Sequence, residues 1–140
     1  MDFPHISHVG IAVKDIESAI KQYSLITGET PEIITVAEQK VKVAIFKKGS
    51  TVGGRVELLE PLSDDSPIAK FIEKRGEGLH HICVCVDDIH IKLEQLKKAG
   101  VALIDDKPKV GAEGNLIAFV HPKDNNGVLL ELEEIKKSTE

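Results

Sequence analysis

Two stretches of this 140-residue chain resemble each other closely enough to indicate an internal duplication. Residues 8–16 begin with His8 and alternate bulky apolar with small residues, and residues 81–89 repeat the pattern from His81, 73 positions later. A second match joins residues 56–59 to residues 130–133, 74 positions apart. Matched segments at nearly constant spacing indicate one module present twice, which constrains the chain to fold as two similar units.

The first copy is predicted to follow the order β-α-β-β-β. Apolar residues alternate over residues 5–13, and a helix follows with Asp15 as its N-cap and Gly28 as its end. Three extended runs complete the copy, with glycines at the turns. These runs cover residues 31–37, 41–48 and 54–60, and the turn glycines are Gly49, Gly53 and Gly54.

The second copy is predicted to repeat this order. A strand over residues 79–87 precedes a helix that Asp87 or Asp88 caps and that Gly100 ends. The extended runs that follow cover residues 101–105, 115–121 and 127–133, with a turn at residues 125–127.

A short helix is predicted to connect the copies. Ser66 and Pro67 are typical of a helix start, as N-cap and first helical residue, and Gly76 ends this helix. The sequence therefore predicts one α+β domain over residues 1–140. Its two βαβββ modules cover about residues 3–60 and 78–135, and the connector about 61–77.

Composition excludes several classes of protein. Hydrophobic residues make up 41% and charged residues 29% of the chain, which is typical of a soluble globular domain. The formal net charge of −5 argues against nucleic acid as a partner. No apolar run approaches the roughly 20 residues of a membrane span, and no signal-peptide pattern follows Met1, so we expect a cytoplasmic protein with no membrane partner.

The side chains available favour a polar or metal-based ligand site. Trp is absent, and one Tyr and four Phe are too few for an aromatic cage. Cys83 and Cys85 lie two apart on a predicted strand, where their Cα atoms are about 6.5 Å apart, close to the limit for a disulfide. We expect no disulfide, and interpret both cysteines as small residues that line the site.

The first strand of each copy carries a histidine with small residues on the same face. Because alternate strand residues point to opposite sides, His8 shares its face with Gly10 and Ala12. His81 shares its face with Cys83 in the same way. A strand that only filled a core would carry bulky residues there. The pattern therefore predicts a hollow beside each imidazole.

An acidic residue lies in the last strand of each copy. Glu57 and Glu131 stand among aliphatic neighbours, where an ionised carboxylate is costly unless it is paired, hydrogen-bonded or metal-bound. If the copies close around a pseudo-two-fold axis, each contributes one imidazole and one carboxylate to the same point. The predicted ligand set is His8, Glu57, His81 and Glu131. It suits one divalent ion, such as cobalt, manganese, nickel or zinc, with positions open for water or substrate.

Taken singly, each of these four residues is more often structural than a ligand. Their matched positions in both copies favour the metal site, because a solvated face has no reason to repeat them. Three other histidines, His5, His80 and His90, are interpreted as structural or surface residues.

Five segments between His5 and Glu133 carry a resemblance to a known family. They are residues 8–13, 56–62, 65–71, 78–82 and 111–132. The histidine and glutamate strands resemble the vicinal oxygen chelate superfamily in general. The connector sequence Ser-Pro-Ile-Ala-Lys-Phe of residues 66–71 and the His-Pro-Lys of residues 121–123 resemble the methylmalonyl-CoA epimerase family within it.

The resemblance implies a fold and an activity. The fold is the glyoxalase/bleomycin-resistance type, in which paired βαβββ modules form a curved eight-stranded mixed sheet around a metal, and the assembly is a homodimer. The substrate is an acyl-CoA: the family interconverts the epimers of methylmalonyl-CoA by moving the α-proton through a metal-stabilised enolate. The implied ion is cobalt, with manganese, nickel or zinc as alternatives.

The resemblance also assigns roles to individual residues. Glu131 matches a residue that is both metal ligand and catalytic base in the family. Some members carry Glu where this chain has Val43, which leaves the second base open among Glu38, Gln39 and a water that they hold. Some members carry Gln where this chain has Glu57, and Lys123 is a candidate contact for a substrate phosphate or carboxylate.

Two other functions remain open from the sequence. One is a glyoxalase-type lyase or isomerase that acts on a glutathione hemithioacetal with an equivalent metal site. The other is a metal-free protein of the same fold that sequesters a ligand, as bleomycin-resistance proteins do.

Overall fold

The computed structural model describes residues 5–47 and 54–135. The chain divides into two compact units, of which the first unit is residues 8–80. Among the described residues, the second unit joins residues 81–135 to residues 5–7. The predicted turn residues Gly49 and Gly53 lie outside the described residues. None of the helices in the described ranges is long and apolar enough to cross a membrane.

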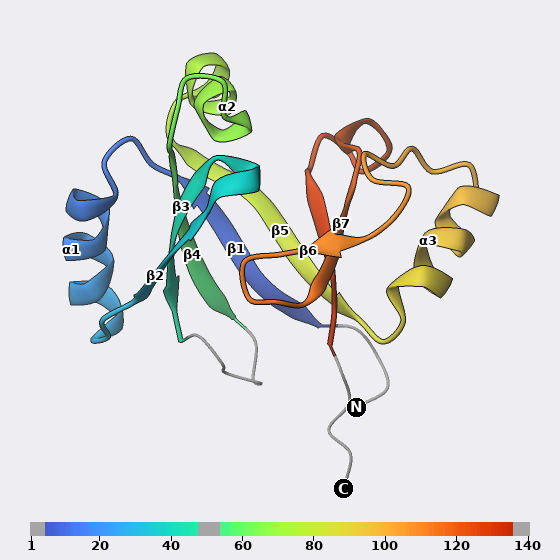
Figure 1. Ribbon diagram of the computed structural model, residues 1–140, viewed down its shortest axis with the longest axis horizontal. Coiled ribbons are helices and arrows are strands. Elements are labelled where there is room, and N and C mark those ends of the chain that lie inside the picture. Colours follow the sequence, from blue (N-terminus) through green and yellow to red (C-terminus); the bar gives the residue numbers. More distant parts are fainter. Residues whose placement is uncertain (1–4, 48–53, 136–140) are drawn as a thin grey trace, which may run out of the picture. The chain divides into compact units, whose positions relative to one another are not determined.

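The first unit contains four strands and two α-helices (Figure 1). The strands are β1 (Ile6–Ala12), β2 (Glu32–Val36), β3 (Val41–Phe46) and β4 (Arg55–Pro61). The helices are α1 (Ile16–Thr27) and α2 (Pro67–Arg75), with a 3-10 turn, η1 (Ala37–Gln39), before β3. The strand order is β2-β3-β4-β1, in which β1 and β4 are parallel and the other pairs antiparallel.

The second unit repeats this arrangement. Its strands are β5 (Gly78–Val86), β6 (Lys109–Val110), β7 (Leu116–Val120) and β8 (Leu130–Glu134). Its helix is α3 (Ile89–Lys98), and a 3-10 turn, η2 (Pro122–Asp124), precedes β8. The order is β5-β8-β7-β6, and again the first and last strands are parallel. The predicted α+β fold class, two βαβββ modules with mixed strand pairing, is confirmed.

The prediction of a strand over residues 101–105 is wrong. Within this run Leu103 forms one isolated bridge to Val120, and the edge strand is β6, further along the chain. The physical reason lies in Asp105, whose Oδ2 accepts the Phe119 N–H at 2.8 Å in place of a backbone carbonyl. The apolar pattern that suggested a strand instead reflects packing, because Leu103 is packed against the cluster beneath α3.

The predicted caps of the helices are mostly confirmed. Asp15 accepts the Glu17 N–H at the start of α1, and Gly28 ends this helix with a positive φ of 73°. Such a left-handed conformation favours glycine. Ser66 caps α2 ahead of Pro67, as predicted. At α3 the N-cap is Asp88, whereas the C-cap is Ala99 and Gly100 follows it.

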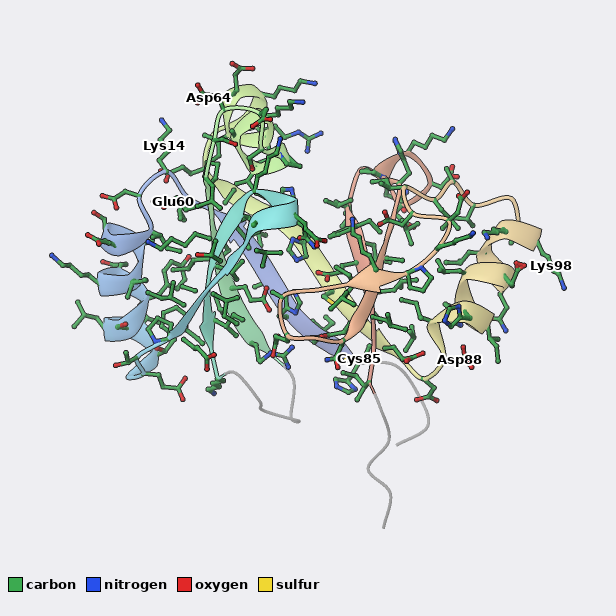
Figure 2. All side chains as sticks on the ribbon, viewed as in Figure 1. Lys14, Glu60, Asp64, Cys85, Asp88 and Lys98 are labelled. Carbon is green, nitrogen blue, oxygen red and sulfur yellow. The ribbon has the colours of Figure 1, made fainter. Side chains whose placement is uncertain are left out.

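In each unit, a carboxylate on the last strand accepts a hydrogen bond from the first turn of the helix that follows the first strand. Glu60, near the end of β4, accepts the Ile16 N–H through Oε2 at 2.9 Å. Glu134, at the end of β8, accepts the Ile89 N–H through Oε2 at 3.1 Å. Figure 2 shows Glu60 beside the start of α1 and Asp88 at the start of α3. The duplication therefore extends to the hydrogen bonds that begin the helices, and both acids also face the positive end of a helix dipole.

Two clusters cover the two faces of the first unit's strands. On one face α1 packs through Ile16 and Tyr23 against Phe46 and Leu58. On the other face α2 packs through Ile68 against Val43, Leu59 and other strand residues. In the second unit α3 packs through Ile89 and Leu93 against β7 and β8. Helix burial on the strands is the main favourable term in folding such a unit.

An exposed ion pair ties the turn before β3 to the start of α2. The Lys40 ammonium contacts Asp65, and the Ser63 hydroxyl donates to the same carboxylate. These two hydrogen bonds, that of Lys40 first, hold the pKa of Asp65 at about 2 instead of its usual 3.8. Because the pKa is depressed, any stability from this contact is present above pH 3.8 and is lost as the pH falls through 2.

We predict that the helix-start carboxylates stabilise each unit by similar amounts. Replacing Glu60 or Glu134 with Ala removes the acceptor for a helical N–H and should lower the free energy of unfolding by about 1 kcal/mol. Urea denaturation measures this change, with the exposed Glu73→Ala on α2 as control. If the two variants lose no more stability than the control, these hydrogen bonds contribute nothing net.

Candidate metal centre

Eight polar or charged residues are buried among the residues that the structure describes. They are Ser7, His8, Arg55, Glu57, Ser66, His81, Glu131 and Glu133. Four of the eight are the residues that the sequence singles out as ligands. A buried ionisable group is costly without a partner. We therefore expect each of these four side chains to contact a group that stabilises it.

His8 and Glu57 lie together in the first unit, on the parallel strands β1 and β4. His8 Nδ1 is 3.4 Å from Glu57 Oε2, and the two side chains are 4% and 7% exposed. In the register of these strands Gly10 lies directly beside Glu57. Because glycine has no side chain, the carboxylate has room to reach the imidazole two residues away.

His81 and Glu131 lie together in the second unit, on the parallel strands β5 and β8. His81 Nε2 is 2.9 Å from Glu131 Oε1, and the side chains are 5% and 9% exposed. Here Cys83 takes the place that Gly10 has in the first unit, directly beside the carboxylate-bearing residue. The ring of Phe119 on β7 meets the His81 ring edge-on, with the centroids 5.8 Å apart.

The two pairs have the same construction. Each joins an imidazole on the first strand of a module to a carboxylate on the last, across a parallel strand pair, beside a small residue. Neutral imidazole and ionised carboxylate are the donors that divalent transition metals accept, and a second group that contacts a ligand fixes its orientation. The chemistry of these donors therefore fits a metal ion.

The cysteines and the other histidines considered from the sequence differ in their surroundings. Cys83 and Cys85 are both buried and are not joined in a disulfide. Cys85 Sγ lies 3.5 Å from His5 Nε2. The His80 ring packs edge-on against Phe71, with 4.9 Å between centroids, while His90 is exposed on α3.

Glu133 is a buried acid that the sequence patterns do not single out. The hydroxyl of Ser7 donates to its Oε1 at 2.7 Å, and the Asn115 amide donates to its Oε2 at 2.9 Å. Cys83 Sγ lies 3.9 Å from the same Oε1. The signal was present in the chain, because Glu133 stands two residues after Glu131 and so shares its face.

The positions considered for a second base differ in their surroundings. Val43 is 2% exposed in the core beneath α2 and has no titratable group. Glu38 is exposed on η1, and Gln39 beside it is half-buried. Lys123, the candidate substrate contact, is exposed on η2.

Comparison with known proteins agrees with this architecture. Residues 7–119 match the model of the Glyoxalase/Bleomycin resistance protein/Dioxygenase superfamily. The chain belongs to this superfamily. The fold that the sequence resemblance implied is thereby confirmed at the level of family.

Relatives place the chain within the superfamily. It is 42% identical to the human mitochondrial methylmalonyl-CoA epimerase, over 92% of this chain and 73% of that one. It is 41% identical to an ethylmalonyl-CoA/methylmalonyl-CoA epimerase of Cereibacter sphaeroides, over 93% of this chain and 97% of that one. A Streptomyces coelicolor methylmalonyl-CoA epimerase in complex with 2-nitronate-propionyl-CoA superimposes with a TM-score of 0.87, 34% identity and 93% coverage of both chains. The predicted kinship with the methylmalonyl-CoA epimerases is confirmed.

Proposed function

We propose that this protein is a metal-dependent methylmalonyl-CoA epimerase. The observation that carries the proposal is the same buried imidazole–carboxylate pair in both units, at 3.4 Å and 2.9 Å. The reaction comes from the relatives, since proteins at 39–42% identity over most of this chain carry that name.

We propose that His8, Glu57, His81 and Glu131 bind one divalent ion between them. Two imidazole nitrogens and two carboxylate oxygens suit cobalt, and also manganese, nickel or zinc. Two carboxylates balance the charge of such an ion, and burial of all four side chains strengthens their attraction for it. When bound, the ion supplies a Lewis acid for the negative charge that develops on a thioester oxygen when the α-proton leaves.

The chain's own residues must move the proton. Epimerisation requires removal of a proton from one side of a carbon and its return on the other, and hence two acid/base groups. Glu131 is our assignment for one of them, because a carboxylate that binds through one oxygen retains the second for a proton. With Val43 in the core, Glu38, Gln39 or a water that they hold remain the candidates for the other.

The proposed reaction predicts exchange of the substrate's α-proton with solvent. Protein loaded with cobalt should catalyse the incorporation of deuterium from D2O at the α-carbon of methylmalonyl-CoA. A Glu131→Gln variant should slow this exchange at least about 100-fold, because it removes a general base. NMR of the recovered substrate measures it. The loaded wild type failing to exchange would sink the epimerase proposal. Turnover of a glutathione hemithioacetal in the same preparation would favour the lyase instead.

The proposed ligand set predicts a loss of metal from variants in either unit. His8→Ala and His81→Ala should each weaken cobalt binding by about tenfold or more, since each removes a donor from the same ion. Metal analysis after dialysis measures this, with the exposed His90→Ala as control. Full metal content in either variant contradicts a shared ion. A wild type that binds no divalent metal supports the metal-free sequestering protein.

We also propose that the protein is a homodimer, as the family resemblance implies. Size-exclusion chromatography with light scattering should give twice the chain mass of 15.3 kDa at micromolar concentration. A mass equal to that of one chain across this range would remove the proposal without affecting the site.

A further inference from the structure

Lys109, Phe119 and Glu131 lie on one face of the second unit's strands. Lys109 on β6 pairs with Ile117 on β7, and Phe119 two residues later pairs with Glu131 on β8. Residues that pair across strands, or that stand two apart along one, share a face. The helix α3 packs against Ala118 and Leu132 and therefore covers the opposite face.

In the first unit, the helix α2 covers the corresponding face of the strands. Ile45 of β3 pairs with Glu57 in the way that Phe119 pairs with Glu131, so Ile45 corresponds to Phe119. Ile45 is fully buried in the cluster that includes Ile68 of α2. No helix among the second unit's described residues packs over the face that carries Phe119. Phe119 is correspondingly half-buried.

A chain of contacts leads from the Lys109 ammonium to the ligand pair. Lys109 Nζ lies 5.4 Å from the centroid of the Phe119 ring, within the range of a cation–π contact. The same ring meets the His81 ring edge-on at 5.8 Å, and His81 pairs with Glu131. One aromatic ring therefore separates a cation from the imidazole–carboxylate pair.

Asp105 holds this arrangement in place. Its Oδ1 lies 3.4 Å from Lys109 Nζ, and its Oδ2 accepts the backbone N–H of Phe119 at 2.8 Å. The Lys109 side chain still remains 44% exposed, whereas that of Asp105 is 17% exposed. The Lys109 ammonium thus contacts Asp105 and the Phe119 ring, and it is still accessible to a third group.

We propose that Lys109 binds an anionic oxygen of the acyl-CoA substrate, with Phe119 as the apolar surface beside it. The inference rests on the proposed function and names a substrate contact for it. An acyl-CoA with a free carboxylate carries anionic oxygens at the acyl group and at its phosphates, and a chain of net charge −5 needs a local cation to hold them. An exposed Lys–Asp pair contributes little to stability on its own.

The test compares Lys109→Met with Lys109→Arg and with Lys107→Met as matched control. Lys107 is an exposed lysine two residues earlier on the same segment. Loss of a charge-assisted contact should raise KM for methylmalonyl-CoA about tenfold or more in Lys109→Met, with kcat within about twofold. The Arg variant should recover most of the loss, and the control should match the wild type. Thermal melting should not distinguish the variants.

Calorimetry with methylmalonyl-CoA and methylmalonyl-pantetheine identifies the anion. A higher Kd for both thioesters in Lys109→Met assigns the contact to the substrate carboxylate, and a higher Kd for the CoA ester alone assigns it to the phosphates. An unchanged Kd for both overturns the proposal. If the wild type binds methylmalonyl-CoA without exchanging its α-proton, the epimerase proposal fails while Kd still decides on Lys109. If the wild type binds neither thioester, both proposals fall.

Discussion

A buried imidazole beside a buried carboxylate, on neighbouring parallel strands, is the constraint that the rest of each unit serves. Neither group is stable there alone, because the desolvation of an unpaired charge costs a large part of the free energy of unfolding of a small domain. Parallel neighbours cannot be joined by a tight turn, so the helix and two strands between them are the connection that this pairing requires. The small residues Gly10 and Cys83 complete the arrangement, since each lies beside the acid at the point where a bulky side chain would separate the pair.

The last strand of each unit serves a second purpose three residues further on. Glu57 faces His8 while Glu60 accepts the first N–H of α1, and Glu131 and Glu134 divide the same tasks in the second unit. An odd separation along a strand places the two acids on opposite sides. A slip of one residue in the strand pairing would reverse both acids, so the register that forms the imidazole–carboxylate pair also fixes where the helix begins.

The repeat makes much of this predictable from the sequence. The helix starts at Asp15 and Ser66 follow from local capping chemistry. The β-α-β-β-β order and the four buried ligand candidates follow from patterns that occur twice in the chain. What the sequence does not reveal depends on contacts that leave no local pattern. The strand expected at residues 101–105 is replaced because a side chain, Asp105, takes a ladder hydrogen bond. The burial of Glu133 depends on Ser7 and Asn115, which are far from it in the chain.

The two units differ most where their sequences depart from the repeat. Leu59 and Ile45, which belong to the closed core beneath α2, correspond by strand position to Glu133 and Phe119 in the second unit. Aliphatic residues that α2 covers are thus replaced by an acid with polar neighbours and by a half-buried ring that carries a cation. A duplicated module can donate metal ligands symmetrically, but a substrate with one carboxylate and one thioester is not symmetric. The Lys109 contact that we propose would supply this asymmetry, because it lies where the first unit has a packed core and the second unit has a half-buried ring.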